Sequence, residues 1–158
     1  MNVEYFHASK YGNGAKVAEE FTRVMATRGA VVNVHHIRDV SAKVLPPADL
    51  YVFSAPGRMG KPIGSMRRFL KHLAAPAGAR FAILTTEGAP QPDKKTGRIP
   101  TEEELAQHQK VTPIMREMLR GAGLVEVAAE KVLVTGMKGP LEEGWEDKVE
   151  AFAARVEV

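Results

Sequence analysis

Two runs of the sequence are apolar at almost every position and are too short to be typical helices. They are DLYVFSAP, residues 49–56, and RFAILTT, residues 80–86. A strand with one face in water alternates apolar and polar residues, whereas a strand buried on both faces of a parallel sheet is apolar throughout. The two runs therefore predict a parallel sheet that other elements cover on both sides.

Strand and helix patterns alternate around these two runs. Further strands are predicted at residues 3–7, 30–37 and 124–134, the last with an interruption near Ala128. Helices are predicted at residues 14–28 and 63–73, from Thr101 onward, and at residues 141–158. Five strands alternating with helices predict an α/β fold with a doubly wound, five-stranded parallel sheet and right-handed crossovers.

The helical pattern that begins near Thr101 contains two local signals. Thr101 and Glu104 have the spacing of a capping box, which places a helix start at Thr101. Pro113 lies inside the pattern, so we expect a kink or a restart there, with Thr112 as the cap of the second segment.

Length and composition narrow the class of protein. The chain has 158 residues, which suits one domain, and we expect residues 1–158 to form it. No apolar run approaches the roughly 18 residues of a membrane helix, and the first residues lack the layout of a secretion signal. We therefore expect a cytoplasmic protein. The absence of cysteine excludes disulfides, iron–sulfur clusters and thiolate zinc sites.

The net charge of +3 suits anionic ligands or acidic partners. A nucleic-acid binder should concentrate its basic residues in a stripe, whereas here they are dispersed among acidic ones. The nearest approach to a stripe is MRRFLKH, residues 66–72, which we interpret as a solvated helix face. We therefore expect no nucleic-acid partner. The five histidines have no metal-binding spacing, and His35 and His36 should point to opposite faces of their strand.

Ligands of doubly wound sheets bind beyond the carboxyl ends of the strands. The loops at that edge include HASKYGNG, SAPGRMGKP and TTEGAPQPDKKTGRIP, after the first, third and fourth strands. GRMGKP has proline where a P-loop needs a hydroxyl, and GNGAKV has valine at the third glycine of a dinucleotide fingerprint. The second strand ends without the carboxylate that would bind the ribose of NAD. Arg38 near its end could instead bind the 2′-phosphate of NADP, so an NADP site remains an alternative.

A nest for a single phosphate fits the first loop better. Residues 9–14 could surround a phosphate with backbone N–H groups at a helix N-terminus, with the Ser9 hydroxyl as a further donor. Gly12 and Gly14 allow close approach of the backbone, and Asn13 tolerates a left-handed conformation. The alternative is an ordinary turn between a strand and a helix.

The segment YFHASKYGNGAKVAEEF resembles the first strand, phosphate loop and first helix of the flavodoxin family. Its Ser-Lys-Tyr-Gly is similar to the subgroup that includes menaquinone-dependent protoporphyrinogen oxidase, as is PADLYVFSAPGRMGKPIGSMRRFL. The resemblance covers nearly the whole chain in element order. It implies a strand order of 2-1-3-4-5 and non-covalently bound FMN.

The resemblance also implies which residues hold the FMN. The phosphate would be bound by Ser9, Lys10, Tyr11, Gly12, Asn13 and Gly14. One side of the flavin ring would be flanked by Pro56, Gly57, Arg58, Met59 and Gly60, and its other side and pyrimidine edge by Thr86, Glu87 and Gly88. Neither ring-side loop contains an aromatic residue, so Arg58 and Met59 either cover the ring or are ordinary loop residues. Tyr11 either donates to the phosphate or lies against neighbouring loops.

Three functions remain open on the sequence. The first is an FMN-binding carrier of electrons between redox proteins such as a reductase or a ferredoxin, with no catalytic side chains of its own. The second is an FMN-dependent oxidoreductase acting on a quinone or protoporphyrinogen, in which residues 88–100 shape the substrate site and Lys94, Lys95 and Arg98 meet carboxylates. The third is a flavin-free binding module that has kept the fold.

Overall fold

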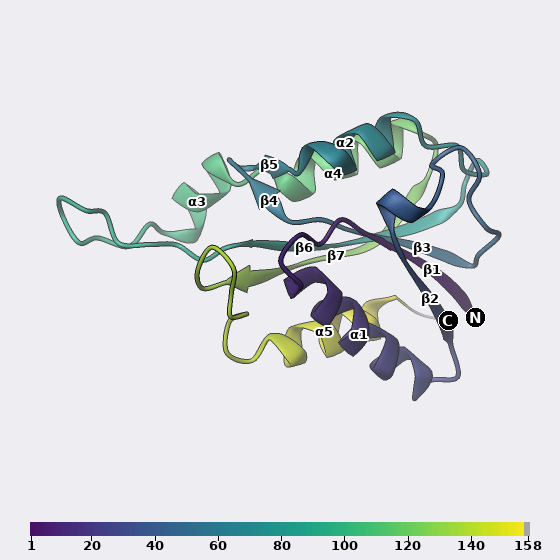
Figure 1. The fold of residues 1–158 in the computed structure, drawn as a ribbon, viewed down its shortest axis with the longest axis horizontal. Coiled ribbons are helices and arrows are strands. Elements are labelled where there is room, and N and C mark those ends of the chain that lie inside the picture. Colours follow the sequence, from purple (N-terminus) through teal and green to yellow (C-terminus); the bar gives the residue numbers. More distant parts are fainter. Residues whose placement is uncertain (157–158) are drawn as a thin grey trace.

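The computed structural model describes residues 1–156 and contains a five-stranded parallel sheet (Figure 1). Its strands are β1 (Asn2–His7), β2 (Val31–His36), β3 (Leu50–Ser54), β6 (Arg80–Gly88) and β7 (Val125–Val134). They lie in the order β2-β1-β3-β6-β7, and every neighbouring pair is parallel. The predicted doubly wound sheet and its order 2-1-3-4-5 are therefore confirmed, since β6 and β7 are the fourth and fifth strands of the sheet.

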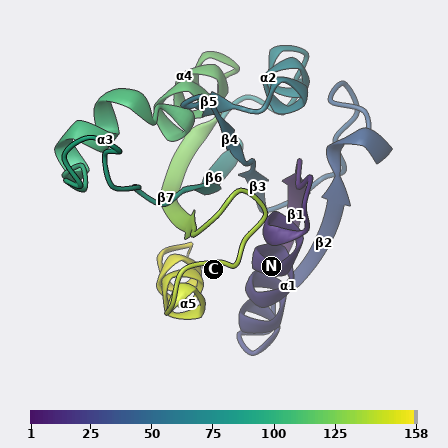
Figure 2. The ribbon, with the colours of Figure 1, turned by 60° about the vertical axis from the view of Figure 1, so that its left-hand side comes forward.

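Helices cover both faces of this sheet (Figure 2). On one face lie α1 (Asn13–Ala26) and α5 (Trp145–Arg155), and on the other lie α2 (Gly64–Lys71) and α4 (Val111–Gly121). Side chains alternate between the two layers, so Tyr5 packs in the α1–α5 layer and Phe6 packs in the α2–α4 layer. β3 is buried at all of its positions, as its continuous apolar run predicts.

The helical segment after residue 100 is divided into two helices, and the second begins at Val111, before the expected restart at Pro113. Thr101 caps α3 (Glu102–His108) by accepting a hydrogen bond from the Glu104 N–H at 3.2 Å, which confirms the capping box. The next helix, α4, has Lys110 at its N-cap, so the prediction that Thr112 caps it is wrong. Pro113 lies in the first turn of α4, where its missing N–H would have no helical acceptor in any case.

Two smaller features are a separate hairpin and a bulge in β7. β4 (Gly57–Arg58) and β5 (Lys61–Pro62) form a short antiparallel hairpin, which the sequence did not predict. In β7, the register with β6 slips by one residue beside Ala128, at the predicted interruption. Such a bulge leaves one residue of β7 unpaired and bends that strand.

Residues 89–101 and α3 project from one end of the sheet as an arm (Figure 1). Within this arm, Arg98 donates two hydrogen bonds of 2.7 Å to the Glu104 carboxylate, which ties residues 89–101 to α3. The last helix was predicted to residue 158, and residues 157–158 lie outside the described part. Each helix within residues 1–156 is too short or too polar to span a bilayer.

Candidate functional site

A cavity of about 400 Å³ opens at the carboxyl ends of β1, β3 and β6. Most of the predicted site residues line it: Ser9, Lys10, Tyr11, Asn13, Gly14, Pro56, Gly57, Arg58, Thr86, Glu87 and Gly88. Its wall also contains Ile63, Val134, Gly136 and Met137, which the sequence did not single out. The volume is within the range of small-molecule and cofactor sites, about 300–1,000 Å³.

The loop between β1 and α1 forms one wall of the cavity and is folded tightly on itself. Gly12 has a φ of +93° and donates its N–H to the Ser9 hydroxyl at 3.2 Å. A Cβ on Gly14 would lie 3.1 Å from the Ser9 Cβ, so the turn leaves room only for glycine without adjustment. The first turn of α1 contains no acidic residue, and the first amides of a helix have no intrahelical acceptor. This wall is therefore suited to an anion.

Two histidines lie beneath this loop. The Ser9 N–H donates to His7 Nδ1 at 3.2 Å, and His36 Nε2 lies 3.0 Å from the Ser9 carbonyl oxygen. Burial, followed by the neighbouring His36 and Arg38, lowers the pKa of His7 to about 4. His7 is therefore neutral near pH 7, and its Nδ1 lone pair is free to accept the Ser9 N–H. His35 points to the other face and contacts Glu4, as predicted for adjacent residues of a strand.

The β4–β5 hairpin forms a second wall. Its base is fixed by the Ile63 N–H, which donates to the Pro56 carbonyl at 3.1 Å. At its tip, the Lys110 N–H donates to the Gly60 carbonyl at 2.7 Å, so the hairpin is anchored to the turn between α3 and α4. Arg58 lines the cavity, whereas Met59 is at the tip with 95% of its surface exposed. Gly12 and Gly60 shape their loops and, like Met59, are absent from the lining.

The floor of the cavity is the carboxyl end of β6, with Thr86 and Glu87 buried there. The Thr85 hydroxyl donates to Glu87 Oε2 at 2.7 Å. Burial raises the pKa of the Glu87 carboxyl, and the Thr85 hydrogen bond and the charge of Lys131 partly oppose this shift. Within residues 1–156, Glu87 is the one acidic side chain that lines the cavity, and its raised pKa reduces the cost of keeping it beside a bound anion.

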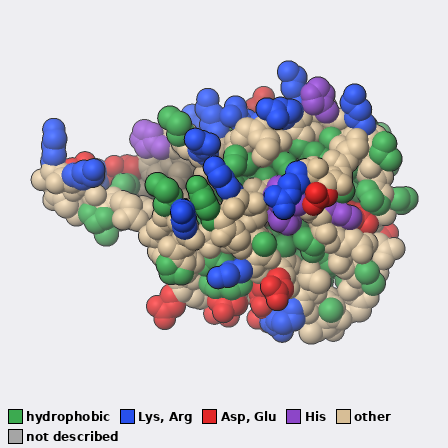
Figure 3. Space-filling view, viewed as in Figure 1, with side chains coloured by type: hydrophobic (Ala, Val, Ile, Leu, Met, Phe, Trp, Pro, Cys, Tyr) green, Lys and Arg blue, Asp and Glu red, His purple; other side chains and the backbone are tan. Residues whose placement is uncertain are grey.

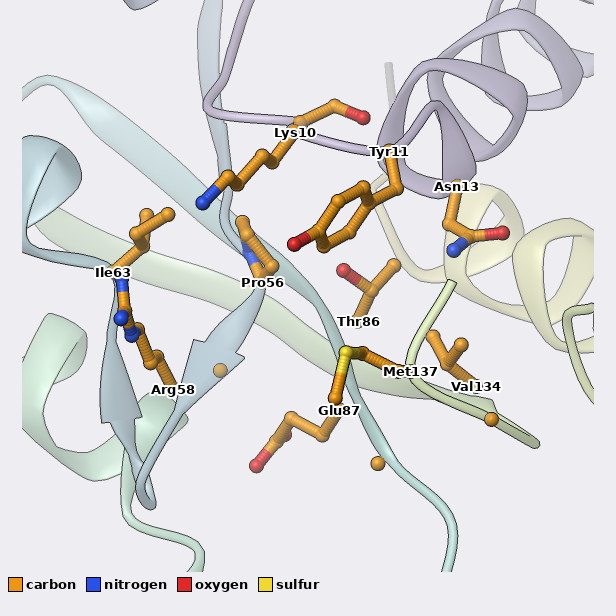
Figure 4. Close-up of a pocket in the computed structure, with 15 residues that line it drawn as sticks. Lys10, Tyr11, Asn13, Pro56, Arg58, Ile63, Thr86, Glu87, Val134 and Met137 are labelled. Atoms are coloured by element: carbon orange, nitrogen blue, oxygen red, sulfur yellow. The ribbon is translucent and has the colours of Figure 1, made fainter. Parts of the chain in front are cut away.

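The loop after β7, residues 135–140, closes the cavity from the far side. Figure 4 shows the Tyr11 ring and the Met137 side chain pointing into the cavity from two different loops. The ammonium groups of Lys10 and Lys138 lie 5.5 Å and 5.6 Å from the centre of the Tyr11 ring. Tyr11 thus contacts Lys138 of the loop after β7, and its donation to a phosphate stays a prediction. This loop was not among the predicted site residues. The feature of the sequence that could have identified it is TGMKGP, a glycine-rich segment that follows the fifth strand.

The remaining sequence candidates lie elsewhere. None of residues 89–101 lines the cavity, so Lys94, Lys95 and Arg98 on the projecting arm do not contact it. Within residues 1–156 no group of three or more His, Asp or Glu side chains is placed to hold a metal ion. The groups that line the cavity and can bind a ligand include backbone amides, hydroxyl groups and the cationic side chains of Lys10 and Arg58.

No family model matches the sequence, and no curated protein matches it either. Solved structures similar to the fold include flavodoxin 2 from Bacillus cereus, with a TM-score of 0.74 and 16% identity over 98% of this chain and 97% of the other. A flavodoxin from Streptococcus pneumonia has a TM-score of 0.70 and 17% identity over 99% and 97%. Rubredoxin oxygen:oxidoreductase from Desulfovibrio gigas has a TM-score of 0.67 and 12% identity over 98% of this chain and 35% of that enzyme. The fold is therefore that of the flavodoxins.

Proposed function

We propose that the protein binds FMN and carries electrons between redox partners. The observation that carries this proposal is the tight turn of residues 9–14, which presents a helix N-terminus free of acidic residues to a cavity of cofactor size. The similar structures support it, because they are named as flavodoxins and one of them is described as oxidised. We further propose that residues 1–158 act as one cytoplasmic domain, with soluble partners such as a reductase or a ferredoxin.

In this proposal the residues have separate tasks. The amides of residues 9–14 and the Ser9 hydroxyl would bind the phosphate. The β4–β5 hairpin and residues 86–88 would flank the ring, with Met137 as an apolar, polarizable contact. Bound FMN would supply one- and two-electron redox chemistry, while the protein would orient it and set the charge around it. Lys10, Arg58 and Glu87 are the charged or ionisable side chains of the lining that would set the electrostatic environment of the ring.

The carrier function is preferred to substrate conversion because of where the charged side chains lie. The arm that was expected to bind carboxylates lies outside the cavity, and its Arg98 is already engaged by Glu104. Within residues 1–156 the titratable side chains that line the cavity are Lys10, Tyr11, Arg58 and Glu87, and no hydrogen bond joins two of them into an acid–base pair.

The test is retention of FMN by the purified protein, followed by visible absorption after gel filtration. Wild type should retain shifted flavin bands. Gly12→Val should weaken binding at least about tenfold, because valine strongly disfavours a φ of +93° and the loop must rearrange. Gly29→Val is the matched control, since Gly29 has a φ of +78° in open space at the end of α1.

Two outcomes would contradict the proposal. Wild-type protein that does not retain added FMN would exclude the cofactor. Equal FMN affinity for Gly12→Val and Gly29→Val, with both variants folded by circular dichroism, would show that residues 9–14 do not bind the phosphate.

A further inference from the structure

A second hollow, of about 570 Å³, lies between the turn that follows β2 and the exposed face of α2. Five nitrogen-bearing side chains line it: His36, Arg38, Lys43, Arg68 and His72. We call this hollow the basic groove. Figure 3 shows Lys, Arg and His side chains gathered over α2 and the turn after β2. The sequence pattern of residues 66–72 alone indicates a solvated helix face, because the lining contributed by residues 36–43 comes from a distant segment.

The positive charge in the basic groove is barely compensated. No acidic side chain lines it, and within residues 1–156 neither Lys43 nor Arg68 has an ion-pair partner. Arg38 has only Asp39, at 3.9 Å, and both side chains are largely exposed. Like charges held around one hollow repel one another, so an anion bound between them gains from all of them.

The other lining residues indicate the chemical class of that anion. Ser41 and Ser65 add hydroxyl groups, and Arg38 and Arg68 add planar donors that match the oxygens of a phosphate. Ile37 and Phe69 form an apolar base. A hollow of about 570 Å³ is larger than an inorganic ion requires and is suited to a nucleotide-sized molecule.

We propose that the basic groove binds a small phosphorylated organic molecule through its phosphate group. This site is separate from the FMN proposal and stands without it. The two sites are nonetheless linked, because His36 lines the groove and also contacts the Ser9 carbonyl of the first loop at 3.0 Å. The Arg38 N–H donates to His36 Nδ1 at 3.2 Å, so the turn after β2 is hydrogen-bonded to the ring that contacts the first loop.

The experiment is an NMR titration of the isotope-labelled protein with AMP, and separately with inorganic phosphate. We expect saturable shifts of backbone amides in residues 36–43 and 65–72. The double variant Lys43→Gln/Arg68→Gln should weaken AMP binding at least about tenfold, because it removes two of the charges that face the phosphate. AMP should bind more tightly than inorganic phosphate, because the apolar base contacts the organic part.

The control is Lys94→Gln/Lys95→Gln, which removes the same charge from the projecting arm and should leave AMP affinity unchanged. Shifts that do not saturate would overturn the proposal, as would equal weakening by the control. AMP shifts confined to residues 9–14 and retained by the groove variant would also overturn it, by assigning the phosphate to the first cavity. Equal affinity for AMP and phosphate would refute an organic ligand. If the protein does not bind FMN, the expected results of this AMP titration remain the same, so the two proposals are tested separately.

Discussion

The buried neutral His7 should make the stability of the protein depend on pH between about 6.5 and 4. In the unfolded chain a histidine has a pKa of about 6.5. In the folded protein the pKa of His7 is about 4, because burial, followed by the neighbouring His36 and Arg38, disfavours its charged form. Between these two values the unfolded state binds a proton that the folded state does not. Stability is therefore retained above about pH 6.5 and is lost as the pH falls toward 4.

The size of this effect follows from the difference between the two pKa values. At about 1.4 kcal/mol for each pH unit, the loss of unfolding free energy attributable to His7 should be about 2 kcal/mol at pH 5 and about 3 kcal/mol at pH 4. These are upper values, since rearrangement of the Ser9 loop would let water reach a protonated ring. Protonation of Nδ1 would also remove the acceptor of the Ser9 N–H.

The assay is urea unfolding of wild type and His7→Gln at pH 7, 6, 5 and 4.5. Glutamine does not titrate, and its amide oxygen can accept the Ser9 N–H, so the variant should lose less stability than wild type as the pH falls. Other groups that titrate in this range are present in both proteins and cancel in the comparison. His108→Gln removes an exposed histidine at the end of α3 and should behave as wild type. Parallel pH profiles for wild type and His7→Gln would refute the reasoning.

Two further substitutions test the walls of the first cavity. Gly60→Ala should destabilise the protein by at least about 2 kcal/mol more than Gly97→Ala in urea unfolding. Both glycines have positive φ, but only at Gly60 would a Cβ come within 1.8 Å of a backbone oxygen, that of His108; equal losses would show that the hairpin is not anchored there. Glu87→Gln should gain stability relative to wild type on going from pH 4 to pH 7, because the raised pKa of Glu87 means that wild type loses stability as this buried carboxyl ionises. The readout is the difference in unfolding free energy between the two proteins at each pH, and a difference independent of pH would contradict the cost assigned to that charge.

The arrangement of the sheet was predictable because its signals are local. Strands buried on both faces must be apolar throughout, and the carboxyl ends of parallel strands share one edge. Those two facts bring residues 9–14, 56–58 and 86–88 together without any knowledge of the structure. Applying the same rule to the fifth strand would have included TGMKGP, and with it Met137.

Other parts of the site depend on contacts between distant segments. The β4–β5 hairpin contains only short strands, and its tip is positioned by Lys110 from another element. The position of His7 under the loop depends on how Ser9 turns back, which no periodicity encodes. The basic groove is assembled from residues 36–43 and 65–72, and only the second of these segments is visibly basic in the sequence.

The first cavity is built from segments spread along almost the whole chain, from Ser9 to Met137. Gly139 lies so close to the first loop that a Cβ there would be 3.0 Å from Asn13 Oδ1. During synthesis on a ribosome, the amides of residues 9–14 would emerge early, while the residues that close the cavity would emerge last. A nascent chain therefore cannot hold a ligand that requires the complete cavity, and loading must wait until β7 has joined the sheet.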